Sequence, residues 1–180
     1  CRTQAQANQA MKELQDILGS LRLTLHPTKT RIVETGLGKE GFVFLGCYFR
    51  SVKSYFNGRT YLFRWPSPKA MKTIRAKIRA LTDRRRWAGM KDIREVVDVL
   101  NPVLRGWGNY FRTGNASTKF QQLDRHVCWR LRRLIARRGG QRGPAVEVTD
   151  RTWPQSRFAA EFQLHRLTGT VRYPGGAHAV

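Results

Sequence analysis

The sequence predicts an α+β fold in which a segment of one helix and several strands is followed by a helical bundle and a short irregular end. Up to Pro66, apolar residues alternate with polar ones or gather in β-branched and aromatic runs, as is typical of strands. From Ser67 they recur at every third or fourth position, which indicates amphipathic helices. We therefore divide the 180 residues into the segments 1–66, 67–142 and 143–180.

The first segment begins with a predicted helix over residues 5–18, which Gly19 ends. A hairpin is expected where two β-rich runs, 51–56 and 59–65, flank Asn57-Gly58, since this dipeptide favours the tight turn between antiparallel strands. Single strands are expected over residues 21–25, 31–34 and 42–49. A helix with antiparallel strands and a hairpin is the predicted architecture up to Pro66.

Three helices are predicted in the second segment. The first begins at Ser67-Pro68, an N-cap residue followed by proline at the first helical position. The second extends from Ile93 to Gly114 and is restarted or kinked at Pro102. The third covers residues 116–138, with apolar side chains inward and arginines on its other faces. Short turns between such helices predict a small three-helix bundle.

The third segment is predicted to be mostly irregular. Residues 139–144 are rich in glycine and predict a flexible joint. Aromatic and leucine side chains between Trp153 and Leu167 offer enough apolar surface to dock on another element, and residues 170–174 are a candidate final strand.

The charge of the chain indicates a polyanionic partner. The sequence has 34 Lys and Arg against 12 Asp and Glu, a net charge of +22. The middle segment, 67–142, alone has 20 basic and 5 acidic residues, a net charge of +15. Self-repulsion of this size is tolerated mainly where nucleic acid neutralises it, so nucleic acid is the first partner to consider.

Other classes of protein are not supported by the sequence. No apolar run approaches the ~20 residues of a membrane-spanning helix, so no membrane partner is expected, and no secretory signal opens the chain. Three widely spaced cysteines favour a reducing cytoplasm over a disulfide framework. Histidines and acidic residues are scattered, with no zinc-ligand spacing and no carboxylate pair for two-metal catalysis.

Aromatic residues interleave with the basic ones, a composition that suits phosphate contacts combined with base stacking. Trp107 and Phe111 fall in register with the apolar stripe of their helix and are expected in the core. Trp129 lies off the stripe of its helix and is the better candidate for stacking or for docking the tail.

Several motifs resemble one family. They are Leu23–Arg31 (LTLHPTKTR), Phe44–Phe49 (FLGCYF), Leu100–Phe111 (LNPVLRGWGNYF), Phe120–Asp124 (FQQLD) and His165–Pro174 (HRLTGTVRYP). Together, in this order and over nearly the whole chain, they resemble the C-terminal half of a group II intron-encoded reverse transcriptase/maturase. The stretch from Asn101 to Phe111 is the most specific of them.

The resemblance implies that residues 1–66 are the end of a polymerase palm. Lys29 would then approach the incoming nucleotide in a supporting catalytic role, since its ammonium group could neutralise or protonate the leaving pyrophosphate. Phe44, Leu45 and Gly46 would belong to the primer grip. The family's Tyr-Ala-Asp-Asp loop would precede Cys1, so we expect the chain alone neither to polymerise nor to hold a cofactor, Mg²⁺ being expected only with that loop.

The resemblance further implies that residues 67–142 are the thumb, or maturase (X) domain, and that residues 143–180 occupy the place of a DNA-binding region. The expected partners are group II intron RNA and an RNA template–DNA primer duplex, with target DNA as a further candidate. The basic residues proposed to contact nucleic acid are Lys69, Lys72, Arg75, Arg79, Arg125, Arg132, Arg133 and Arg137.

Two other functions remain open from the sequence. One is a free-standing RNA-binding adaptor that acts only in splicing. The other is a basic component of a ribonucleoprotein without polymerase activity, although this leaves the strands and hairpin before the bundle unexplained.

Overall fold

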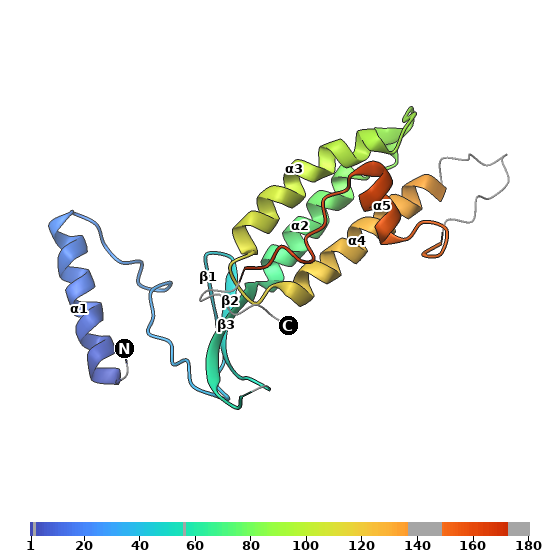
Figure 1. The fold of residues 1–180 in the computed structure, drawn as a ribbon. Helices are drawn as coiled ribbons and strands as arrows, with labels where there is room; N and C mark the ends of the chain where they lie inside the picture. Colours follow the sequence, from blue (N-terminus) through green and yellow to red (C-terminus); the bar gives the residue numbers. More distant parts are fainter. Residues whose placement is uncertain (2, 56, 137–148, 173–180) are drawn as a thin grey trace.

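A computed structural model describes residues 1, 3–55, 57–136 and 149–172, and it confirms the α+β class (Figure 1). A three-stranded antiparallel sheet, ordered β1-β2-β3, lies at one end of a helical bundle. The elements are α1 (Gln4–Ser20), β1 (Phe42–Phe44), β2 (Cys47–Lys53), β3 (Thr60–Pro66), α2 (Pro68–Leu81), α3 (Arg94–Phe111), α4 (Ser117–Ala136) and α5 (Gln155–Phe162), with a 3-10 turn at Arg85–Trp87.

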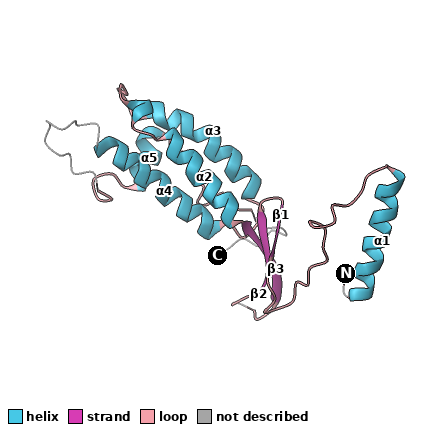
Figure 2. Cartoon of the chain, turned by 180° about the vertical axis from the view of Figure 1, so that it is seen from behind, coloured by secondary structure: helices cyan, strands magenta, loops and turns pink. Residues whose placement is uncertain are grey.

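Helix α1 confirms the first predicted helix. It begins with a capping box in which Thr3 Oγ1 accepts from the Gln6 N–H and the Gln6 side chain accepts from the Thr3 N–H. None of its residues is buried, and Ile17 is 60% exposed. Figures 1 and 2 show α1 set apart from the bundle at the end of an extended linker.

The strands predicted at 21–25 and 31–34 are wrong, because residues 21–41 form turns and extended chain. A strand exists only when its N–H and C=O groups pair with a neighbouring strand, and the three described strands pair with one another. The alternation of apolar and polar residues therefore indicated an extended backbone, but it did not show whether a neighbouring strand was available for pairing.

The single strand predicted over 42–49 is also wrong, since the chain reverses at Leu45-Gly46 and makes β1 and β2 a hairpin. Both turn residues have positive φ, 46° and 74°, and Phe44 pairs with Cys47 across the turn. Two consecutive left-handed residues are the geometry that matches the twist of a two-residue hairpin, and Gly46 adopts it without a Cβ clash.

The second hairpin is confirmed. Strands β2 and β3 pair from Cys47↔Pro66 to Lys53↔Thr60. The connection is longer than a two-residue turn, covering residues 54–59, and Gly58 within it has a φ of 66°.

The three predicted helices form the bundle, and their apolar stripes make its core. Ser67 caps α2, its Oγ accepting from the Ala70 N–H at 3.2 Å. Pro102 lies within α3, which continues through it. The fully buried core side chains include Ile78, Val96, Leu100, Leu104, Phe120, Leu123 and Leu131. Within the described residues, none of the helices is both long and apolar enough to cross a bilayer.

The C-terminal segment is less irregular than predicted. Residues 155–162 form α5, which lies against α4, and Phe158 is fully buried in the common core (Figure 1). Residues 170–172 form no strand, although the Arg172 N–H donates to the Arg112 carbonyl at 2.7 Å. Residues 173 and 174 and the joint at 139–144 lie outside the described residues.

A tail strap, residues 163–170, follows α5 and is fastened to α4 by one buried carboxylate. Asp124 Oδ1 accepts from the Leu167 N–H at 3.0 Å, and Oδ2 accepts from the Thr168 N–H at 2.9 Å and the Thr168 hydroxyl at 2.7 Å. Leu167 is fully buried against Gly108 of α3, where a Cβ would lie 2.5 Å from its Cδ2. A Cβ at this position would force the buried Leu167 side chain to shift.

Helix α3 fastens the same strap through Asn101. Its Oδ1 accepts from the His165 N–H at 2.8 Å, and its Nδ2 donates to the Gln163 carbonyl at 3.0 Å. Gln163 ends α5 in the left-handed conformation, with a φ of 55°. The strap is thus tied to two helices that are distant from it in sequence.

Replacing the buried carboxylate tests the strap. We expect Asp124→Ala to lower the free energy of unfolding by about 2–3 kcal/mol, because the Leu167 and Thr168 N–H groups lose a charged acceptor. Urea unfolding followed by circular dichroism measures this. The control Asp98→Ala, at an exposed carboxylate on α3, should stay within about 0.5 kcal/mol of the original. Equal effects of the two changes would show that the strap does not stabilise the bundle.

The cysteines should differ sharply in reactivity. Burial raises the pKa of the Cys128 thiol to about 11 and also raises the pKa of Cys47, whereas Cys1 is exposed. Because the thiolate is the reactive form, iodoacetamide near neutral pH should label Cys1 alone in the folded chain and all three in denaturant. Mass spectrometry reads the labelled positions. Labelling of Cys128 at the rate of Cys1 would contradict the packing of α4.

Candidate nucleic-acid groove

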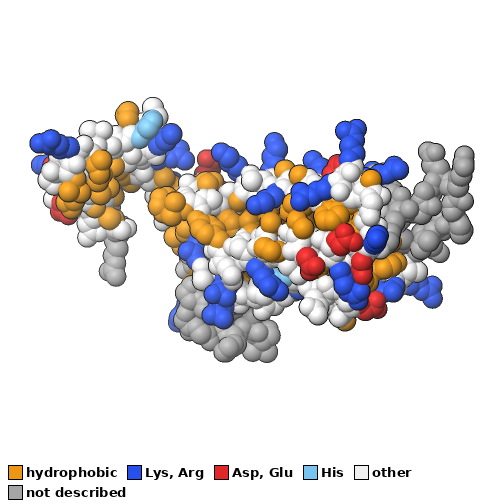
Figure 3. Space-filling model, turned by 90° about the horizontal axis from the view of Figure 1, so that it is seen from above, with side chains coloured by type: hydrophobic (Ala, Val, Ile, Leu, Met, Phe, Trp, Pro, Cys, Tyr) orange, Lys and Arg blue, Asp and Glu red, His pale blue; other side chains and the backbone are white. Residues whose placement is uncertain are grey.

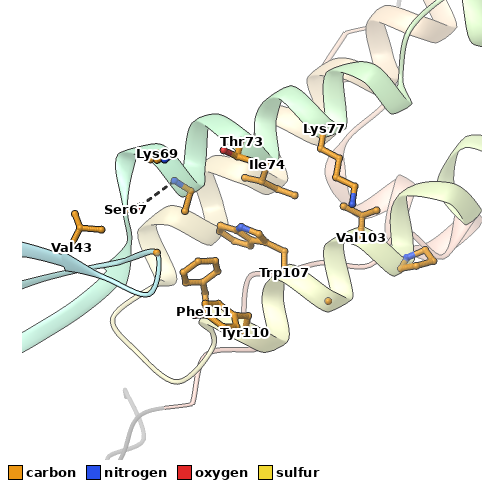
Figure 4. Close-up of a pocket in the computed structure, with 14 residues that line it drawn as sticks. Val43, Ser67, Lys69, Thr73, Ile74, Lys77, Val103, Trp107, Tyr110 and Phe111 are labelled. Atoms are coloured by element: carbon orange, nitrogen blue, oxygen red, sulfur yellow. Dashed lines mark hydrogen bonds between the residues drawn. The ribbon is translucent and has the colours of Figure 1, made fainter. Parts of the chain in front are cut away.

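A groove of about 890 Å³ lies between α2 and α3 and ends at the β1–β2 turn (Figure 4). Its walls come from elements far apart in the sequence, which the sheet and the bundle bring together. The lining residues are Val43, Gly46, Ser67, Lys69, Ala70, Thr73, Ile74, Lys77, Pro102, Val103, Gly106, Trp107, Tyr110 and Phe111.

The floor of the groove is aromatic and its rim is basic. Trp107 is half-buried and packs on Phe111 with ring centroids 4.6 Å apart, so the edge of the core forms the floor. Lys69 and Lys77 line the α2 side, and Figure 4 shows the Lys77 side chain extending toward Val103 of α3. An apolar surface beside ammonium groups is suited to a ligand that combines rings or sugars with phosphates.

The β1–β2 turn is held in place at the end of the groove by both of its carbonyl groups. The Ser67 N–H donates to the Gly46 carbonyl at 2.9 Å, and the Tyr110 hydroxyl donates to the Leu45 carbonyl at 2.8 Å. The backbone of the turn is thereby fixed to α2 and α3, while the side chains of Phe44 and Leu45 remain 59% and 68% exposed. The turn thus combines a backbone that is hydrogen-bonded to α2 and α3 with exposed apolar side chains.

The structure gathers only some of the predicted site residues at this groove. Gly46 and Lys69 line it, and the exposed Phe44 and Leu45 stand at its end. Lys72 is exposed on α2 but does not line the groove. Lys29 is exposed in a turn of the linker and is not among the lining residues. Its supporting catalytic role stays a prediction.

Arg75 and Arg79 belong to a second basic surface, where α2 meets α4. They lie near His126, and together with Arg130 they lower the pKa of its imidazole, although burial is the larger cause. Arg130 is fixed at the end of α2, its Nε donating to Thr82 Oγ1 at 2.8 Å and its Nη2 to the Thr82 carbonyl at 3.1 Å. This surface is therefore separate from the α2–α3 groove.

Arg132 has a structural role that the sequence did not indicate. Its side chain is only 15% exposed, donates from Nε to the Trp153 carbonyl at 2.7 Å and forms an ion pair with Asp150. It therefore holds the segment before α5 onto α4. Arg125 and Arg133 are exposed on α4, and Arg137 lies outside the described residues. Contact of these four arginines with nucleic acid stays a prediction.

The sequence did not indicate Lys77 or Val103 as groove residues, and Trp107 was expected in the core. Val103, Trp107 and Tyr110 recur at spacings of four and three, so they form a stripe beside the core stripe of α3. That stripe was visible in the sequence. The exposure of this stripe was not visible in the sequence, because it depends on where α2 stops covering α3.

The surface of the bundle combines charge and apolar area. Figure 3 shows an apolar strip along the bundle with Lys and Arg side chains on both sides of it. The acidic residues at the start of α3 make local interactions. Asp92 pairs with Arg94 at 2.8 Å, and Glu95, in the first turn of α3, accepts from the Lys91 and Asp92 N–H groups. In the part of the chain that the structure describes, no three His, Cys, Asp or Glu side chains are placed to hold a metal ion.

These features define a strongly basic helical bundle with an aromatic groove, joined to a small antiparallel sheet. Residues 71–153 match the family model of the group II intron maturase-specific domain. The match confirms the resemblance to the C-terminal region of group II intron maturases. It supports a maturase role in splicing and implies group II intron RNA as a partner. A comparison with curated proteins gives no match.

Acid should destabilise the bundle through two partly buried imidazoles. The pKa values of His126 and His165 are lowered from 6.5, chiefly by burial. The unfolded chain therefore takes up these protons first, so the free energy of unfolding should fall as the pH drops below 6.5. Urea titrations between about pH 7 and pH 5 measure the slope.

His126→Gln should flatten that slope, because the glutamine side chain does not titrate in this range. His26→Gln, at an exposed histidine outside the bundle, is the matched control. A slope that His126→Gln does not alter would contradict the lowered pKa of this imidazole.

Proposed function

We propose that this chain is the RNA-binding thumb and maturase part of a group II intron reverse transcriptase/maturase, which grips intron RNA for splicing and a template–primer duplex for cDNA synthesis. The observation that carries the proposal is the α2–α3 groove, which lies largely within the matched maturase-specific domain and ends at the fixed β1–β2 turn.

The chemistry of the groove supports a nucleic-acid ligand over a purely apolar one. Lys69 and Lys77 supply ammonium groups for phosphates, and Trp107 and Tyr110 offer aromatic surface for sugars or bases. The net charge of +15 over residues 67–142 would attract a polyanion to this region from a distance.

The geometry of the turn supports the primer-grip role proposed for Phe44, Leu45 and Gly46. A primer end must be held at a constant position for nucleotide addition, which requires a backbone that does not move. The hydrogen bonds from Ser67 and Tyr110 to the turn carbonyls provide this constraint. The primer would then contact the exposed side chains at the end of the groove.

The linker and the tail contribute differently to the proposal. Lys29 would act near the incoming nucleotide only in the presence of the family's catalytic loop. The described part of residues 143–180 packs on the bundle, so we propose that it supports the RNA-binding surface. Target DNA remains a candidate partner of this segment.

Binding measurements with three probes test the proposal: a group II intron RNA, an RNA template–DNA primer duplex and a double-stranded DNA of equal length. Both RNA-containing probes should bind, with affinity falling at least tenfold between about 50 and 200 mM salt because neutralised phosphates release counterions. A flat salt response would contradict the proposal. Binding to intron RNA without binding to the template–primer would leave the splicing role alone.

A double lysine replacement tests whether the template–primer duplex binds in the α2–α3 groove. Lys69→Ala combined with Lys77→Ala should weaken template–primer binding and reduce the salt slope by about 1–2, because two phosphate contacts are lost. Lys12→Ala combined with Lys53→Ala is the control, since these lysines are exposed outside the groove. If the control pair changes the slope as much as the groove pair, the groove is not the duplex site.

A further inference from the structure

Trp129 is a large aromatic side chain on the solvent side of α4, where the core does not need one. It is 47% exposed, whereas Val127, Cys128 and Leu131 beside it in the sequence are buried. Arg125 precedes it by four residues and Arg133 follows it by four, so these three side chains share one face of the helix. The face is an aromatic ring between two exposed arginines.

The indole ring is supported from the α2 side by groups that are themselves held. The His126 ring stacks on it with centroids 6.1 Å apart and an interplanar angle of 25°. The guanidinium carbon of Arg130, which is hydrogen-bonded to the end of α2, lies 5.9 Å from the indole centroid. Trp129 therefore has a defined orientation although nearly half of its surface faces solvent.

The third group that contacts the ring is exposed to solvent, unlike His126 and Arg130. The guanidinium carbon of Arg133 lies 5.3 Å from the indole centroid, and Arg133 is exposed. A base stacked on an aromatic ring is held more strongly than an exposed guanidinium over the same ring. A base can therefore replace Arg133 on the indole, and the released guanidinium remains close enough to contact the adjoining phosphate.

This surface is distinct from the α2–α3 groove, whose lining comes from the β1–β2 turn, α2 and α3. A side chain that projects from a helix reaches the face of a base only when that base is unstacked, because a duplex covers the faces of its bases. Aromatic and guanidinium groups together recognise single-stranded nucleic acid through stacking and phosphate contacts.

We propose that Trp129, flanked by Arg125 and Arg133, is a stacking site for an unpaired base of the bound RNA. The proposal rests on the proposed function, in that the chain binds RNA, and adds a second contact surface on α4. It assigns the groove to duplex and the α4 face to a single-stranded loop or bulge.

The test compares two probes, an oligoadenylate of about 12 nucleotides and a blunt RNA duplex of about the same length. Trp129→Ala should weaken oligoadenylate binding by about 5- to 100-fold, because the stacking surface is lost, and change duplex binding by less than about twofold. Trp129→Phe should retain most of the single-strand affinity. Tyr55→Ala is the control, since this tyrosine is 99% exposed between β2 and β3 and should leave both affinities unchanged.

The outcomes separate this proposal from the proposed function. If the unaltered chain binds neither probe nor intron RNA, the proposed function fails. If it binds intron RNA with the expected salt dependence but Trp129→Ala leaves oligoadenylate binding unchanged, the stacking site alone is overturned. Equal weakening of both probes, or a loss that Trp129→Phe shares fully, also overturns it, because either result indicates a general effect on the α4 surface rather than stacking.

Discussion

The buried carboxylate of Asp124 is the interaction on which the shape of the bundle depends. In a chain with a net charge of +22, it is an acidic group placed inside the core, where it accepts three hydrogen bonds from the tail strap. The strap then covers part of α3 and α4 with Leu164 and Leu167. The strap thereby closes one side of the bundle, whereas the α2–α3 groove and the outward face of α4 are open to solvent.

The arginines of β3 and of the bundle include two kinds that composition does not distinguish. Arg64, Arg130 and Arg132 donate hydrogen bonds to backbone carbonyls and fasten the sheet, the end of α2 and the segment before α5. Arg125 and Arg133 are exposed. A guanidinium has five donors in a fixed fork, so it can join segments as readily as it can bind phosphate. Part of the positive charge is therefore structural.

At the candidate sites, as in the fold, hydrogen bonds and ring contacts fix some groups and leave their neighbours exposed. Hydrogen bonds from Ser67 and Tyr110 fix the carbonyls of the β1–β2 turn, and this leaves the neighbouring side chains free to meet a ligand. On α4, contacts with His126 and Arg130 orient Trp129 without covering it. In both places the structure holds one part of a residue or turn rigid and exposes another, which is what recognition of nucleic acid at a defined position requires.

The sequence by itself determined α1 to α4, the second hairpin, the core stripes and the resemblance to the family, because helical periodicity, caps and turn dipeptides are local signals and the motifs lie in order along the chain. It did not indicate α5. It misplaced what depends on distant partners: residues 21–34 have no strand to pair with among the described residues, and Leu45-Gly46 turns back instead of continuing a strand. Only the tertiary structure decided which arginines are structural, that Trp107 lines a groove, and that Asp124 and Asn101 hold the tail. Those outcomes depend on hydrogen bonds and burial between residues up to 64 positions apart, which no local pattern encodes.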